Sequence, residues 1–157
     1  MRRLPLSRHF LFCNHPAWRM QRRQLCFFQL HPLHRRRYGV RTQNQEALRA
    51  ALPAYPQELI IPFQTHSTDS LVIDETYQHA TCSERHSMLQ GIDALITDMP
   101  GYCICISTAD CIPILLYDKQ HRVVAAVHAG WRGTVNRILA KTLLRMQVLT
   151  ARKEKTS

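Results

Sequence analysis

The alternation of hydrophobic and polar positions predicts short strands over most of the chain beyond residue 57. The clearest pair is Ile112–Tyr117 and Arg122–His128, two apolar runs that contain β-branched residues. The polar tetrapeptide Asp118–His121 separates them, which predicts an antiparallel hairpin. Shorter apolar runs predict further strands over Glu58–Phe63, Leu71–Asp74, Gly91–Thr97 and Tyr102–Ser107.

Helical patterns occur in two places, and strands do not alternate regularly with them. Residues 44–52 have a helix-favouring composition that ends at Pro53. A second helix of about four turns is predicted to follow Thr134, which would be its N-cap. Residues 78–90 are polar and aperiodic, which predicts a mobile loop, and residues 151–157 predict a polar tail. This order of elements predicts an α+β fold. The apolar face of the second helix is formed by Val135, Ile138, Leu139, Thr142 and Met146.

The net charge of +10 belongs to one quarter of the chain. Residues 1–41 contain ten arginines and no lysine, aspartate or glutamate, whereas the remaining residues contain equal numbers of basic and acidic side chains. The body of the protein therefore lacks the basic surface of nucleic-acid binders, and we expect no nucleic-acid partner. No apolar run is long enough to cross a membrane, so we expect no membrane partner either.

The six cysteines show neither a zinc-finger spacing nor a C-x-x-C motif. Cys103 and Cys105 alternate with isoleucines in a predicted strand, so we expect them on one face. Without a recognisable export signal, reduced thiols and a cytoplasmic location are expected.

The predicted hairpin brings Cys111, directly before its first strand, close to His128 at the end of its second. Among the other histidines, His66 is the best third partner because it follows a predicted strand in a polar context. The three would form an open His2Cys zinc site. Two alternatives remain: buried structural roles for the thiol and imidazoles, or a Cys111 nucleophile with His128 as base and Asp110 orienting the base or the substrate.

An anion site is predicted beside this cluster. Arg132 presents a guanidinium fork, and the amides of Gly133–Val135 would open the predicted helix, so a phosphate or carboxylate could bind there. The alternative is a capped helix with a solvent-exposed arginine.

Motifs in this region resemble those of the YfiH family, also called the multicopper polyphenol oxidoreductase or laccase family. The segments TADCIPILL (Thr108–Leu116) and VHAGWRGT (Val127–Thr134) resemble its paired signatures. Gln64–His66 is similar to its Gln-Val-His motif, and Gly91–Thr97 is similar to its G-x-D-A-L-[IV]-T strand. The resemblance covers about residues 40–146.

The resemblance implies a mixed-sheet α+β sandwich with flanking helices. It also implies that His66, Cys111 and His128 are the metal ligands and catalytic residues, with zinc as the metal and copper as the alternative. The implied activity is phosphate-dependent cleavage of adenosine, inosine, guanosine and methylthioadenosine, together with adenosine deamination. Asp110 and Arg132 would then bind purine nucleoside and phosphate. One His2Cys site lacks the ligands of a multicopper cluster, so the laccase activity fits less well.

The chain departs from the family pattern at both ends. The family's glycine-rich N-terminal pattern is absent, and so is its C-terminal third. However, residues 14–37, translated one nucleotide later, are codon-compatible with TTRHGGCSDGSYASFNFTPYTGDD, which matches the missing N-terminal pattern. We therefore hypothesise that residues from about 13 to 39 are an out-of-frame translation, with the frame restored before Val40.

These observations predict three segments: an aberrant arginine-rich segment at 1–41, a partial YfiH-like catalytic domain at 42–150 and the polar tail. We expect this chain to fold poorly and to have little phosphorylase activity by itself. A copper-dependent polyphenol oxidoreductase and a Cys–His amidase or hydrolase acting in peptidoglycan editing remain alternatives. The sequence does not specify the oligomeric state.

Overall fold

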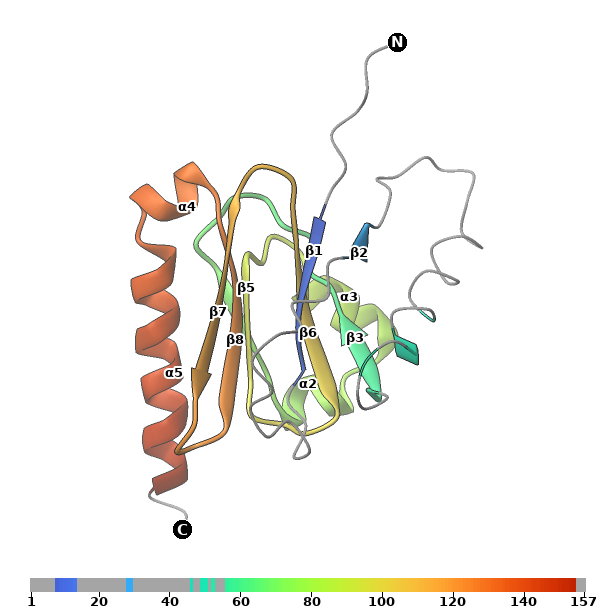
Figure 1. Ribbon diagram of the computed structural model, residues 1–157. Coiled ribbons are helices and arrows are strands. Elements are labelled where there is room, and N and C mark those ends of the chain that lie inside the picture. The colour runs from blue at the N-terminus through green and yellow to red at the C-terminus, as the bar shows by residue number, and fades with distance from the viewer. Residues whose placement is uncertain are drawn as a thin grey trace.

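A computed structural model describes residues 8–13, 28–29, 46, 49–50, 52 and 56–154. Within them, the strands form two four-stranded sheets, in the orders β2-β1-β6-β3 and β4-β5-β8-β7 (Figure 1). Each sheet contains one parallel pair, β3 with β6 and β4 with β5, so both are mixed. The strands are β1 (Arg8–Cys13), β2 (Phe28–Gln29), β3 (Glu58–Ile60), β4 (Ser70–Ile73), β5 (Ala94–Thr97), β6 (Tyr102–Thr108), β7 (Ile112–Asp118) and β8 (Val123–Ala129).

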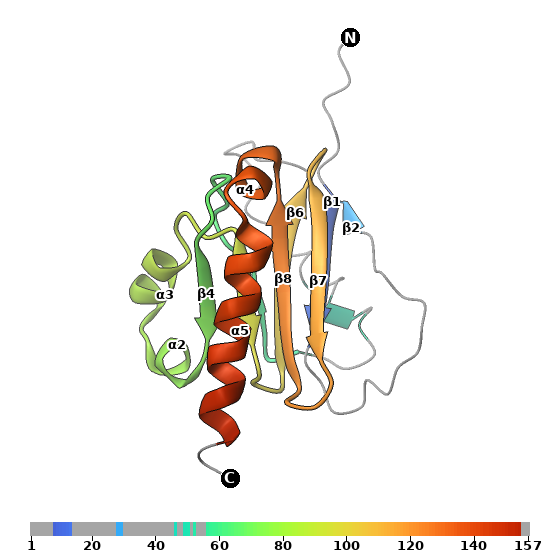
Figure 2. The same cartoon turned by 90° about the vertical axis from the view of Figure 1, so that its left-hand side faces the viewer.

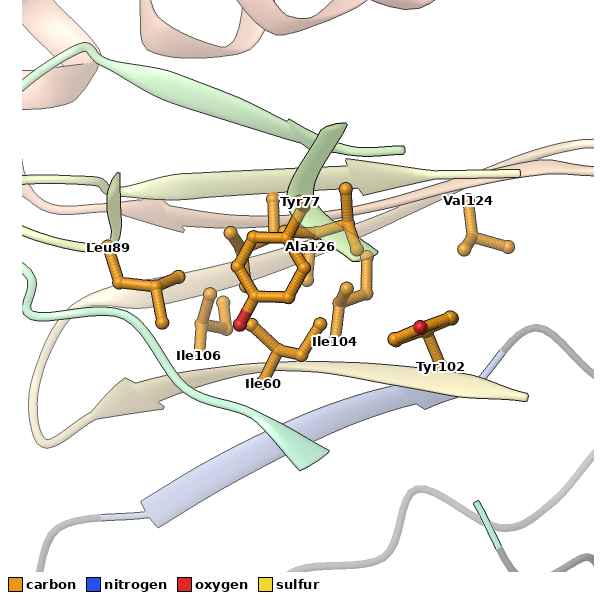
Figure 3. Close-up of a cluster of buried hydrophobic side chains, with 10 residues drawn as sticks. Ile60, Tyr77, Leu89, Tyr102, Ile104, Ile106, Val124 and Ala126 are labelled. Atoms are coloured by element: carbon orange, nitrogen blue, oxygen red, sulfur yellow. The ribbon is translucent and has the colours of Figure 1, made fainter. Parts of the chain in front are cut away.

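The two sheets enclose the main hydrophobic core, in which alternate residues of β6 and β8 face one another (Figure 3). Ile104 and Ile106 of β6 are fully buried there, as is Ala126 of β8. Cys103 and Cys105 lie on the opposite face of β6 in a separate buried cluster, which confirms that they share one face. The period of two in these strands therefore determines which side chains enter the sandwich.

Helix α5 (Ile138–Glu154) covers the outer face of the β4-β5-β8-β7 sheet (Figure 2). Ile138, Thr142 and Met146 are its buried residues, at the spacing of one helix face. The helix period predicted by the sequence is thus confirmed, and so is the α+β sandwich with flanking helices.

The start of this helical region differs from the prediction. A short helix, α4 (Trp131–Val135), has Gly130 as its N-cap, and α5 begins only after a break at which Arg137 has a φ of 61°. Thr134 therefore lies inside α4, and the prediction that it caps one continuous helix is wrong. Val135 is 73% exposed because the break separates it from the buried face of α5.

Residues 78–90 do not form the predicted loop. They contribute to α2 (Glu75–His79) and α3 (Cys82–Met88), which pack beside the β4 edge of the sandwich (Figure 2). Reciprocal hydrogen bonds between Thr81 and Glu84 form a capping box at the start of α3. The prediction is wrong because these short helices have N-terminal caps, and α2 buries Tyr77 in the core, although neither helix has an apolar stripe.

The N-terminal segment contributes a strand that the sequence pattern did not predict. β1 pairs with β6 along its whole length, from Arg8 opposite Thr108 to Cys13 opposite Cys103.

Of the helix predicted over residues 44–52, positions 46, 49 and 50 are helical, and most of the others lie outside the described residues. Most of the arginine-rich segment and the end of the polar tail also lie outside them, although α5 extends to Glu154. No helix in the described part of the chain is long and apolar enough to cross a membrane.

Candidate metal centre

The β7–β8 hairpin brings Cys111 and His128 together, as the sequence predicts. Ile112 lies opposite Ala129 and Pro113 lies opposite His128, so the residue directly before β7 reaches the end of β8. His128 is 4% exposed, whereas Cys111 is half-buried. The hairpin therefore places a buried imidazole next to a thiol that solvent can reach.

His66 completes the cluster from the loop that follows β3. Its Nε2 lies 3.7 Å from Sγ of Cys111, and its ring packs edge-on against His128 with 4.8 Å between ring centroids. The potential ligand atoms of His66, Cys111 and His128 all lie within 4.8 Å of one another. His66 has a φ of 62°, the left-handed region, which is uncommon for a residue with a β-carbon and is held by its surroundings.

Asp93 supplies those surroundings. Its fully buried carboxylate accepts a hydrogen bond of 2.7 Å from Nδ1 of His128. It also accepts hydrogen bonds of 2.8–3.0 Å from the backbone amides of Thr65, His66 and Ser67. Burial by itself would raise the pKa of Asp93, but the hydrogen bonds from His128 and the amides outweigh it and lower the pKa to about 2. Asp93 is thus an ionised acceptor for both histidine segments.

No function of Asp93 is predicted from the sequence. The available signal was an acidic residue directly before the apolar run Ala94–Thr97, in a segment singled out only for its resemblance to a family motif. A charged residue is almost never fully buried unless it is paired. That rule indicates a partner for Asp93 but does not identify it.

Two further residues shape the cluster. Gly130 lies so close to it that a β-carbon would be 2.7 Å from Cδ2 of His66 and 3.1 Å from Sγ of Cys111. Gln64 hydrogen-bonds to both backbone groups of Ser107, donating to the carbonyl at 2.8 Å and accepting from the amide at 2.7 Å. This pair of hydrogen bonds ties the His66 loop to the end of β6, from which the chain continues to Cys111.

The structure places the remaining candidates around this cluster and not within it. Asp110 and Arg132 are both exposed, Asp110 directly before Cys111 and Arg132 in the first turn of α4. Of the amides expected to form an anion site at Gly133–Val135, that of Thr134 instead donates to the carbonyl of Gly130 inside α4. Three other histidines have partners elsewhere: His79 with Glu75, His86 with Gln90, and His121 with Asp118.

The donor set fits a transition metal. Two imidazoles and one thiolate with an open fourth position match a catalytic zinc site, and the same donors suit copper. Nitrogen and sulfur ligands at tetrahedral angles around zinc are roughly 3.6 Å apart, close to the observed 3.7 Å between His66 and Cys111. His128 engages Nδ1 with Asp93 and so leaves Nε2 for a metal.

The model of a protein family described as multi-copper polyphenol oxidoreductase laccase matches residues 38–157. The chain therefore belongs to this family, and the resemblance seen in the sequence is confirmed. The fold agrees with it. A crystal structure of the Bacillus licheniformis hypothetical protein YfiH has a TM-score of 0.56 and 27% identity, over 65% of this chain and 38% of that one. YlmD from Geobacillus stearothermophilus has a TM-score of 0.59 and 25% identity, over 68% and 40%.

Curated relatives carry the names of purine enzymes. A purine nucleoside phosphorylase of Bacteroides thetaiotaomicron is 55% identical over 105 residues, which are 67% of this chain and 39% of that protein. A protein named adenosine deaminase RL5, from an unknown prokaryotic organism, is 49% identical over 52% of this chain and 31% of its own length. The chain thus spans less than half the length of these relatives.

Proposed function

We propose that this chain carries the metal-dependent catalytic centre of a purine nucleoside phosphorylase. The observation that carries the proposal is the convergence of His66, Cys111 and His128, with their ligand atoms within 4.8 Å. A relative at 55% identity named purine nucleoside phosphorylase supports the substrate class. Substrates would be purine nucleosides such as inosine, guanosine, adenosine and methylthioadenosine, with inorganic phosphate.

The proposed reaction is cleavage of the nucleoside by phosphate. A phosphate oxygen bonds to C1′ of the ribose as the bond from C1′ to the base nitrogen breaks. The products are the purine and ribose 1-phosphate, or its 5-methylthio analogue from methylthioadenosine, and the purine takes up the proton that hydrogen phosphate loses as it forms the ester. Exposed Arg132 is suited to bind the phosphate by its guanidinium fork, and Asp110 to accept hydrogen bonds from the nucleoside.

His66, Cys111 and His128 would hold zinc or copper. A metal ion there supplies Lewis acidity and activates water. The adenosine deaminase name of one relative supports a second reaction at the same centre, hydrolytic loss of the 6-amino group. Asp93 keeps Nδ1 of His128 protonated by accepting its hydrogen, so that Nε2 faces the cluster.

Phosphate-dependent release of hypoxanthine from inosine by the zinc-loaded chain tests the proposal. We expect weak release that needs phosphate, is lost with a chelator and disappears in Cys111→Ala. Asp118→Asn, at the opposite end of the hairpin, is the matched control and should retain the activity. Release that persists in Cys111→Ala would contradict the proposal.

Assays of the same purified chain distinguish two alternative functions. The proximity of Cys111 to His128, with their side-chain ligand atoms within 4.8 Å, is also compatible with a Cys–His hydrolase in which His128 is the base. Its activity would survive a chelator but not a thiol alkylator. The second alternative, suggested by the family description alone, is a copper-dependent polyphenol oxidase, which would consume oxygen with a phenol only after copper loading.

We also propose that residues from about 13 to 39 are translated out of frame, ahead of a partial catalytic domain at 42–150. The family match begins at residue 38, next to the expected return of the frame, which supports the proposal. Sequencing the gene tests it. The DNA must encode a glycine-rich string in the +1 frame, and a gene that cannot do so refutes the idea.

A further inference from the structure

We infer that Asp93 is a positioning residue that fixes both histidine ligands before any metal binds. The inference rests on the proposed metal centre and extends it to a residue that is not itself a ligand. Its basis is that one buried carboxylate contacts the ring of His128 and the backbone of His66, which come from segments 62 positions apart in the chain.

Each carboxylate oxygen of Asp93 accepts two of these four hydrogen bonds. Oδ1 accepts from the His66 amide at 3.0 Å and from Nδ1 of His128 at 2.7 Å. Oδ2 accepts from the amides of Thr65 at 3.0 Å and Ser67 at 2.8 Å. All four partners are donors, so only a group with acceptors at both ends satisfies them, and an ionised carboxylate is such a group.

The amide contacts determine the shape of the His66 loop. Three successive N–H groups converge on one carboxylate, and the central residue of the three has the left-handed φ of 62°. Backbone in this region is uncommon for a residue with a β-carbon and persists where the surroundings impose it. Ser67 adds a side-chain hydrogen bond of 2.6 Å to the carbonyl of Gly91, two residues before Asp93. The loop is therefore held in a shape that turns Nε2 of His66 toward Cys111.

The ring contact determines the tautomer of His128. Because the carboxylate can only accept, Nδ1 must carry the proton, and Nε2 keeps its lone pair for a metal. The backbone amide of His128 also donates to the carbonyl of Asp93 at 2.8 Å, which fixes the two residues relative to each other. Asp93 thus controls the orientation and the ligating nitrogen of this histidine.

An amide in place of the carboxylate satisfies only half of these donors. In Asp93→Asn, the NH2 group must face either the Thr65 and Ser67 amides or the His66 amide and Nδ1 of His128. The second orientation would move the imidazole proton to Nε2, the nitrogen needed for the metal. Asp118→Asn is the matched control, because Asp118 also accepts from a histidine Nδ1 at 2.7 Å, in the β7–β8 turn.

The experiment measures Zn²⁺ affinity by competition with a chromophoric chelator in the full chain and in both variants. We expect Asp93→Asn to bind zinc about 10- to 100-fold more weakly, the usual effect of losing a group that hydrogen-bonds to a metal-bound histidine. Asp118→Asn should match the unmodified chain. Equal circular dichroism of the metal-free proteins checks folding, and an Asp93→Asn variant that folds and binds zinc with unchanged affinity would overturn the inference.

A second measurement needs no variant at Asp93 and no metal. In the metal-free chain with ¹⁵N-labelled histidine, we expect His128 to be the Nδ1–H tautomer, assigned with a His128→Gln variant. A predominant Nε2–H tautomer would overturn the inference even if Asp93→Asn fails to fold. If neither the unmodified chain nor Asp118→Asn binds zinc, the proposed metal centre fails, while the tautomer still decides the role of Asp93.

Discussion

Two aspartate–histidine pairs lie at opposite ends of the β7–β8 hairpin with the same contact distance and very different surroundings. Asp118 and His121 form one in the turn, and Asp93 and His128 form the other beside Cys111, each with 2.7 Å between Nδ1 and a carboxylate oxygen. The turn pair has side chains 31% and 18% exposed, whereas the other pair is 0% and 4% exposed. Contact distance alone therefore does not distinguish a surface pair from part of a site.

The additional donors explain the difference. Asp118 accepts amides from Gln120 and His121, two and three residues away, so its pair is a product of the local turn. The hydrogen bond from His121 is the largest cause that lowers the pKa of Asp118. Asp93 accepts from amides 26 to 28 positions away, so it joins separate segments of the chain. Long-range donors around a buried carboxylate make the second pair part of a site.

Removing the histidine of each pair should give the largest contrast. His128→Ala removes a proposed ligand, so we expect zinc affinity to fall by more than the roughly 100-fold that follows loss of a ligand's hydrogen-bond partner. His121→Ala should leave zinc affinity unchanged. Competition with a chelator measures the zinc affinity of both variants. Comparable losses of zinc affinity in the two would contradict the distinction between the pairs.

Removing the carboxylate of each pair should lower the free energy of unfolding by very different amounts. Asp93→Ala leaves three backbone amides and a ring N–H without their acceptor, and each buried donor left unsatisfied costs about 1–3 kcal/mol, so we expect the free energy of unfolding to fall by several kcal/mol. Asp118→Ala should cost at most about 1 kcal/mol because its pair is partly exposed. Urea unfolding of the metal-free variants gives both values. A loss below about 1 kcal/mol for Asp93→Ala would contradict the role assigned to it.

Adding a methyl group beside the proposed ligands should weaken metal binding more than it destabilises the fold. In Gly130→Ala the new β-carbon meets His66 and Cys111, and overpacking of this kind costs about 1–3 kcal/mol. We expect zinc affinity to fall about tenfold. Gly133→Ala, whose β-carbon would meet Ser67 and Ile138, should mainly lower the unfolding midpoint. Equal zinc affinities for these two variants would argue against close packing of Gly130 on the ligands.

The smallest effect is expected from the Gln64 hydrogen bonds that hold the His66 loop. Gln64→Ala removes two hydrogen bonds to Ser107, each with a net contribution of about 0.5–1.5 kcal/mol. The free energy of unfolding should fall by about 1–3 kcal/mol, with only a few-fold loss of zinc affinity. Gln120→Ala, an exposed glutamine in the hairpin turn, is the control and should change neither quantity. Identical unfolding curves for the two would show that these hydrogen bonds do not hold the loop.

Local patterns were sufficient to predict the hairpin and hence the meeting of Cys111 and His128, because a tight turn determines which residues lie opposite one another. The position of His66 depended on its polar context and on a family motif. Asp93 was not predicted because its function arises from a loop that folds back onto it from an earlier part of the chain. No periodic pattern records such a contact.

Errors in the helical regions have a different origin. The capping box at Thr81 and Glu84 was present in the sequence, but the absence of an apolar stripe favoured a loop. In the C-terminal helical region, Val135 continues the apolar spacing of α5 in the sequence. However, Arg137 adopts a left-handed backbone, and this break separates Val135 from α5. Nothing in the composition of that segment marks the break, since arginine is usually a good helix former.

The central claim is that His66, Cys111 and His128 form one metal site. The most direct test is the metal content of the purified chain compared with that of Cys111→Ala, after both are loaded with zinc and freed of excess metal. We predict about one zinc per chain in the unmodified protein and almost none in the variant. Equal zinc content in the two proteins would contradict the claim.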